Sequence, residues 1–171
     1  MRVLITAHND IFDRLERVPS LLPTLARVVF ALVFLMYFLN SAMTKVDGSI
    51  FTPSFNAFAQ ILPKAAEAVS YDTSQLTGLQ SLIIVAGTIG EFVLPVLVVI
   101  GLLTRLAALG MIGFVAVQTL VDVTGHGAAL GGWLDNTVGL LDQRTLWVFL
   151  FAVIVITGPG KLSVDRLLGL R

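Results

Sequence analysis

A long apolar stretch that contains a single acid constrains this chain most. Residues 79–100 carry Glu91 as their only charged side chain, and about 20 apolar residues are enough to cross the hydrocarbon core of a bilayer. We therefore predict a membrane-spanning helix here. An ionised residue near the middle of such a helix costs about 3 kcal/mol to insert. Glu91 is therefore expected to face other helices or a wet cavity.

The composition of the whole chain agrees with a membrane protein. Of its 171 residues, 56% are hydrophobic and 13% are charged, whereas soluble domains carry about 25% charged residues. The net charge of zero gives no indication of a nucleic-acid partner. The chain has no cysteine, which excludes disulfides and iron–sulfur ligation by its own residues. Two histidines argue against a haem or a bound metal held by this chain alone.

Apolar runs of helical length recur along the chain. Short connections between them favour an antiparallel four-helix transmembrane bundle, an all-α integral membrane fold over residues 24–160. The four predicted spans are residues 24–44, 79–100, 105–121 and 143–157.

Amphipathic segments are predicted on either side of this domain. Residues 1–23 place Ile11, Leu15 and Val18 at helical spacing, which favours a helix lying on the membrane surface. The alternative is a solvated tail whose periodicity arises by chance. Residues 161–171 are expected to form a short C-terminal surface segment that begins at Ser163.

The first loop, residues 46–78, is too apolar to lie free in water and too broken to span. Pro53 suits the first position of a helix, and Phe55 and Phe58 then fall on one face before Pro63 interrupts the pattern. We predict an amphipathic helix embedded in one leaflet, which could form a lid over the bundle.

Basic residues predict the orientation, because cytoplasmic loops are enriched in lysine and arginine. Eight cations fall on the side of the two termini and three on the other side, which places both termini in the cytoplasm. The eight are Arg2, Arg14, Arg17, Arg27, Arg105, Lys161, Arg166 and Arg171, and the three are Lys45, Lys64 and Arg144.

Several short patterns together resemble the DoxX family of small bacterial four-span inner-membrane proteins. The resemblance covers roughly residues 24–168 and implies a location in the bacterial inner membrane. It also implies a link with quinone reduction or with membrane-associated oxidoreductase assemblies in which the DoxX chain is the integral partner. The matching pieces are Arg27 and Lys45 at the two ends of the first span, Glu91, the turn at 101–105, and the ending from Gly158-Pro159-Gly160 to Ser163-Val164-Asp165.

Three polar residues are expected at similar membrane depth. Asn40 lies 13 residues from Arg27, and Gln118 lies 13 residues from Arg105, at a rise of about 1.5 Å per residue. Glu91 is expected at a comparable membrane depth on its own helix. The cluster would either hold the helices together by hydrogen bonds or form a ligand or proton site.

Glu91 has three interpretations. It could be protonated, because burial disfavours the charged form. It could be ionised and paired with Arg27, Lys45 or Arg105. It could also face a quinone carbonyl and exchange protons with it, as intramembrane carboxylates do in proton relays.

Asp122 and His126 lie at the outer rim of the predicted third span. Two ligands without a third are weak support for a metal site, and no bound metal is expected. Proton exchange with the outside and ordinary loop hydrogen bonds are the other interpretations.

These observations lead to one functional hypothesis and two alternatives. The chain would be the integral subunit of a quinone-linked redox assembly, with Glu91 as the proton-handling residue. Asn40, Gln118, Arg105 and Lys45 would contact the quinone, and other subunits or a homo-oligomer in the lipid bilayer would complete the assembly. The alternatives are a non-catalytic structural subunit and, less well supported because no inverted repeat is detected, a small transporter.

Overall fold

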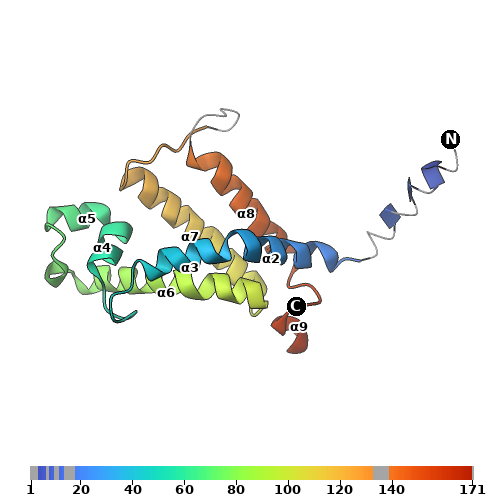
Figure 1. The fold of residues 1–171 in the computed structure, drawn as a ribbon, viewed down its shortest axis with the longest axis horizontal. Coiled ribbons are helices and arrows are strands. Elements are labelled where there is room, and N and C mark those ends of the chain that lie inside the picture. The colour runs from blue at the N-terminus through green and yellow to red at the C-terminus, as the bar shows by residue number, and fades with distance from the viewer. Residues whose placement is uncertain (1–3, 7, 10–11, 14–17, 133–138, 171) are drawn as a thin grey trace.

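The computed structural model describes residues 4–6, 8–9, 12–13, 18–132 and 139–170, and within them the regular elements are helices without a strand (Figure 1). This confirms the predicted all-α class. Ile11 and Leu15, on which the predicted N-terminal surface helix depends, lie outside the described residues.

Two to three helices among the described residues can cross a membrane by length and composition. Helices α6 and α7 are each long and apolar enough to cross a membrane. Helices α2 and α3 together form a third candidate if the bent pair is one span. The apolar part of α8, Gln143–Thr157, is shorter, so the four-span antiparallel bundle stays a prediction. The bounds of the long helices are α2 Leu21–Val33, α3 Leu35–Met43, α6 Gly78–Ile100, α7 Thr104–Thr124 and α8 Leu140–Thr157.

The segment predicted as one span over residues 24–44 is bent. Helices α2 and α3 meet at Phe34 with an angle of 42°. Backbone hydrogen bonds continue across the break, from Phe34 N to Phe30 O at 2.8 Å and from Phe38 N to Phe34 O at 3.0 Å. The bend therefore changes direction without leaving these backbone groups unpaired.

Helix α6 has well-defined ends that match its sequence. Thr77 accepts a hydrogen bond from Gln80 N, and the Gln80 side chain accepts one from Thr77 N, which is a capping box. Gly101 ends the helix in the left-handed conformation at φ 73°, which glycine adopts without steric cost.

Replacing Gly101 with alanine is expected to destabilise the fold strongly. The left-handed conformation costs an L-residue about 1–2 kcal/mol, and a Cβ at this position would lie 2.6 Å from both Arg27 Nη2 and Ser163 Cβ. Thermal unfolding in detergent measures the loss. Gly113→Ala in α7 is the matched control, since a Cβ there meets nothing within 4 Å; equal stability of the two variants would contradict the prediction.

Aromatic side chains fill the core between α2, α3, α7 and α8. Phe30 packs edge-on against Phe151 with ring centroids 5.4 Å apart, and Trp147 lies edge-on to Phe34 at 5.0 Å. Such pairs add about 0.5–1.5 kcal/mol each beyond the area they bury.

A network of buried hydrogen bonds connects α2, the end of α6 and the segment after α8. Buried Arg27 of α2 donates hydrogen bonds to the carbonyls of Val98 and Val99 in the last turn of α6, and to those of Pro159 and Leu162 after α8. A cation here also meets the negative end of the α6 dipole.

Asp165, in the short helix α9 (Val164–Leu167), extends this hydrogen-bond network. Its carboxylate accepts hydrogen bonds from Leu103 N, Thr104 N and Thr104 Oγ1 at 2.6–2.8 Å. Burial opposes ionisation of Asp165, but these bonds and the Arg27 charge outweigh it and lower its pKa. The C-terminal segment is thereby tied to the start of α7.

The first loop folds back onto α6. It contains α4 (Phe55–Ile61), α5 (Pro63–Ala68) and the 3₁₀ turn η1 (Thr73–Gln75). The first of these helices begins at Phe55, with Ser54 as its cap, and not at the predicted Pro53. Phe58 is buried against Ile84 of α6. Phe55 stays exposed, so the predicted apolar face is only partly buried.

Candidate functional site

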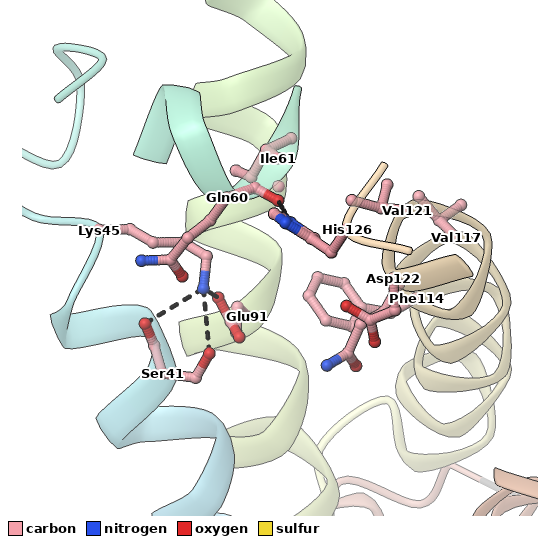
Figure 2. A pocket seen from close by; sticks show the side chains of 12 residues that line it. Ser41, Lys45, Gln60, Ile61, Glu91, Phe114, Val117, Val121, Asp122 and His126 are labelled. Carbon is pink, nitrogen blue, oxygen red and sulfur yellow. Dashed lines mark hydrogen bonds and ion pairs between the residues drawn. The ribbon is translucent and has the colours of Figure 1, made fainter. Parts of the chain in front are cut away.

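The described residues enclose a cavity of about 250 Å³ under the first loop, here called the ion-pair cavity (Figure 2). Helices α3, α4, α6 and α7 and the residue His126 contribute its walls. Its lining mixes charged, amide and apolar side chains: Ser41, Lys45, Gln60, Ile61, Gly87, Glu91, Phe114, Val117, Gln118, Val121, Asp122 and His126.

A buried ion pair forms one wall of this cavity. Lys45 Nζ lies 2.7 Å from Glu91 Oε2, and the two residues are 8% and 2% exposed. At this distance the two side chains form an ion pair. Lys45 Nζ also donates to Ser41 O at 3.1 Å and to Ser41 Oγ at 3.0 Å, as Figure 2 shows. The ammonium thus has a polar neighbour for each of its three N–H groups.

Local structure explains how the pair meets. Lys45 lies two residues beyond the end of α3, and its side chain reaches back one turn along that helix. Glu91 lies on the buried face of α6 with Thr88 and Pro95. Of the three cations that the sequence offered as partners, the structure selects Lys45. Arg27 and Arg105 instead donate hydrogen bonds to main-chain carbonyls.

Gln118 of α7 adds an amide that is only partly satisfied. Its Nε2 donates to Tyr37 Oη at 3.3 Å, whereas its Oε1 is buried without a hydrogen-bond partner. An unpaired buried polar atom costs about 1–3 kcal/mol. Gln118 therefore has hydrogen-bonding capacity that a ligand in the cavity can use.

The outer part of the cavity is bordered by Asp122 and His126. Arg144 Nη2 of α8 donates to Asp122 Oδ2 at 2.7 Å, and the same guanidinium lies 4.6 Å from the centroid of the Trp147 ring. His126 Nε2 lies 3.1 Å from Gln60 O of α4. Because a carbonyl only accepts, this ring nitrogen carries the proton.

The structure brings three of the predicted site residues to the cavity and leaves two away from it. Lys45, Glu91 and Gln118 line it. Asn40 is exposed on α3 and Arg105 is exposed at the start of α7, where it donates to Val155 O and Ile156 O. Asn40 therefore does not line the cavity with Glu91, because a shared depth along two helices does not specify which way the side chains face.

Sequence reasoning missed several wall residues. Ser41 and Gln60 are ordinary polar residues in the sequence, and nothing marked them as neighbours of Lys45 or His126. The pairing of Asp122 with Arg144 had a weak signal, because both lie at the same predicted membrane edge of consecutive apolar helices. Among the described residues, no group of three or more histidine, aspartate or glutamate side chains is placed to hold a metal ion.

Apolar helices of membrane-spanning length around a buried ion pair define the chain as a helical membrane protein. More narrowly, it belongs to the DoxX family, whose family model matches residues 22–127, more than half of the chain. The resemblance inferred from the sequence is thereby confirmed. Searches of curated proteins and of solved structures found no match.

Proposed function

We propose that the chain is the integral membrane subunit of a quinone-linked redox assembly, with the ion-pair cavity as its site for the quinone head group. The observation that supports this most is the Lys45–Glu91 pair in the wall of a cavity between apolar helices. Removing two charges from water costs several kcal/mol per ion before their attraction repays it. Ionisable residues within membrane segments are rare and mark substrate, ion or proton pathways.

The chemistry of the cavity fits a small ring with polar substituents. Phe114, Val117 and Ile61 offer apolar contacts, and Gln118 Oε1, which has no hydrogen-bond partner, can accept a hydrogen bond from a hydroxyl of the reduced ring, the quinol. Lys45 is already surrounded by acceptors. Glu91 and Gln118 are therefore the residues that would hold the ligand.

A proton route to the solvent supports the same proposal. Reduction of a quinone to a quinol consumes two electrons and two protons. The cavity extends from buried Glu91 to exposed His126, so Glu91 can exchange protons with the outside along it. The electrons would come from a partner subunit that carries a redox cofactor, since this chain has no cysteine and only two histidines.

One observation favours a second candidate, a structural subunit without chemistry. The ammonium of Lys45 is held by both Ser41 and Glu91, so the pair also fastens the end of α3 to α6. In that case the pair would stabilise the fold, and the assembly would need no ligand in the cavity.

Quinone bound to the protein purified in mild detergent from its native membrane tests the proposal. We expect close to one quinone per chain after organic extraction, and several-fold less in Glu91→Gln and in the double variant Lys45→Met/Glu91→Leu. Glu67→Gln, which neutralises an exposed acid on α5, is the matched control and should retain the quinone. Background quinone in every sample, or equal amounts in all variants, would contradict the proposal and favour the structural candidate.

A further inference from the structure

A second cavity lies at the other end of the helices, where α2 begins and α8 ends. Its volume is about 320 Å³, and it is here called the basic cavity. Its walls come from the start of α2, the start of α7, the segment after α8 and helix α9. Figure 1 shows α9 and the beginning of α2 at this end, away from α4 and α5.

The charged residues of the basic cavity all have the same sign. Arg105, Lys161 and Arg166 line it, and no aspartate or glutamate does. None of the three cations forms an ion pair with another described residue. Asp165, the neighbour of Arg166, directs its carboxylate to the Leu103 and Thr104 amides instead. The positive charge of the cavity is therefore not neutralised by the described residues.

Contacts between its walls fix the shape of the basic cavity. Arg105 Nη1 donates to Val155 O at 2.6 Å in the last turn of α8. Gly160 lies against α2 so closely that a Cβ would be 2.7 Å from Thr24 Oγ1. The walls are thus positioned by contacts that do not use the side chains of Lys161 or Arg166.

Exposed apolar side chains lie close in sequence to the cations of this cavity. Leu162 and Ile156 are 75% exposed and Leu167 is 85% exposed, although each lies within a few residues of a cavity cation. Large exposed apolar side chains grouped beside a charged cavity mark contact with a partner or a membrane. In a chain with helices of membrane-spanning length, lipid acyl chains can cover such side chains and remove them from water.

We propose that the basic cavity binds the head group of an anionic phospholipid, whose acyl chains lie against the adjacent exposed leucines and Ile156. Basic pockets between membrane helices bind phosphate-bearing lipid head groups, and each lysine or arginine near the surface contributes measurably to the affinity. The three cations, none of which has an acidic partner among the described residues, supply the charge. The exposed apolar side chains distinguish a lipid from a free anion. This site is independent of the ion-pair cavity and of the quinone proposal.

Lipid titration of the purified full-length protein tests this proposal. Native mass spectrometry in detergent would compare phosphatidylglycerol, phosphatidylcholine with the same acyl chains, and inorganic phosphate. We expect phosphatidylglycerol to bind most tightly. Its affinity should fall about fivefold for Lys161→Gln or Arg166→Gln and about 25-fold for the double variant. Lys64→Gln, an exposed cation on α5 at the other end, is the matched control and should bind as the parent does.

Each other outcome overturns the proposal. Equal binding of phosphatidylcholine would show that charge is not recognised. Inorganic phosphate that displaces phosphatidylglycerol at equal concentration would indicate a free-anion site. Unchanged phosphatidylglycerol binding in a double variant that unfolds at the parent's temperature would place the lipid elsewhere.

Discussion

Replacing Glu91 with glutamine is expected to lower the free energy of unfolding by about 3–5 kcal/mol. The substitution keeps the shape of the side chain but leaves the Lys45 ammonium, 8% exposed, without its counter-charge. The hydrogen bonds to Ser41 remain, and they are too few to replace an ion-pair partner at this depth. The change is measured by titrating the protein, solubilised in a mild detergent, with a denaturing detergent and monitoring its helix content by circular dichroism.

The double variant Lys45→Met/Glu91→Leu separates the charge from the fold. Apolar residues of similar volume often replace a buried ion pair with little loss of stability, so we expect most of the stability lost in Glu91→Gln to return. Glu67→Gln should unfold with the parent. A double variant that is no more stable than Glu91→Gln would contradict this account, since the cost would not then come from an unpaired charge.

The same variants distinguish the two candidate functions. If the pair acts in chemistry, the double variant should be stable and lack bound quinone. If the pair only fastens α3 to α6, the assembly should be recovered as well from the double variant as from the parent. Stability and ligand content are measured on the same preparations, so a failure of folding cannot be mistaken for a loss of binding.

Replacing Arg27 with methionine is expected to cost at least about 3 kcal/mol of stability. The last four carbonyls of a helix have no partner within the helix. In α6, Leu97 O accepts from the Gly101 and Leu102 amides, but the Val98 and Val99 carbonyls depend on the Arg27 guanidinium. Methionine retains the apolar stem and leaves these carbonyls, together with Pro159 O and Leu162 O, without their charged donor.

Two comparisons make the Arg27 prediction specific. Arg27→Lys should recover only part of the loss, because an ammonium on a flexible stem cannot reproduce the planar fork of donors. Lys64→Met, which removes an exposed cation from α5, should leave the unfolding transition unchanged. Equal stability of Arg27→Met and Lys64→Met would show that water replaces the guanidinium at these carbonyls.

The cations near the C-terminal segment are thus of two kinds. Arg27 is buried and satisfied by main-chain carbonyls, which makes it a structural residue. Lys161 and Arg166 have no acidic partner among the described residues and line a cavity. The sequence treats all of them alike as positive charges on one side of the membrane.

Several features of this protein were determined by the sequence itself. The length and hydropathy of residues 79–100 require a helix that can cross a bilayer, and the isolated acid at Glu91 requires a partner or a polar cavity. Gly101 ends that helix because only glycine adopts φ 73° without strain. Gly158 and Ser163 likewise mark the end of α8 and the start of α9. All of these depend on local geometry or on partition into lipid.

The tertiary structure decided which residues meet. Arg27, Lys45 and Arg105 were equally suitable partners for Glu91 by charge, and only the rotation of α6 and the turn after α3 bring Lys45 within 2.7 Å. The same rotations leave Asn40 exposed while Gln118 reaches the cavity. The hydrogen bonds of Arg27 and Asp165 likewise join segments that are distant in the sequence. Helical periodicity defines a face of a helix, but the direction in which that face points is set by packing against the other helices, and a pattern along one segment does not contain that information.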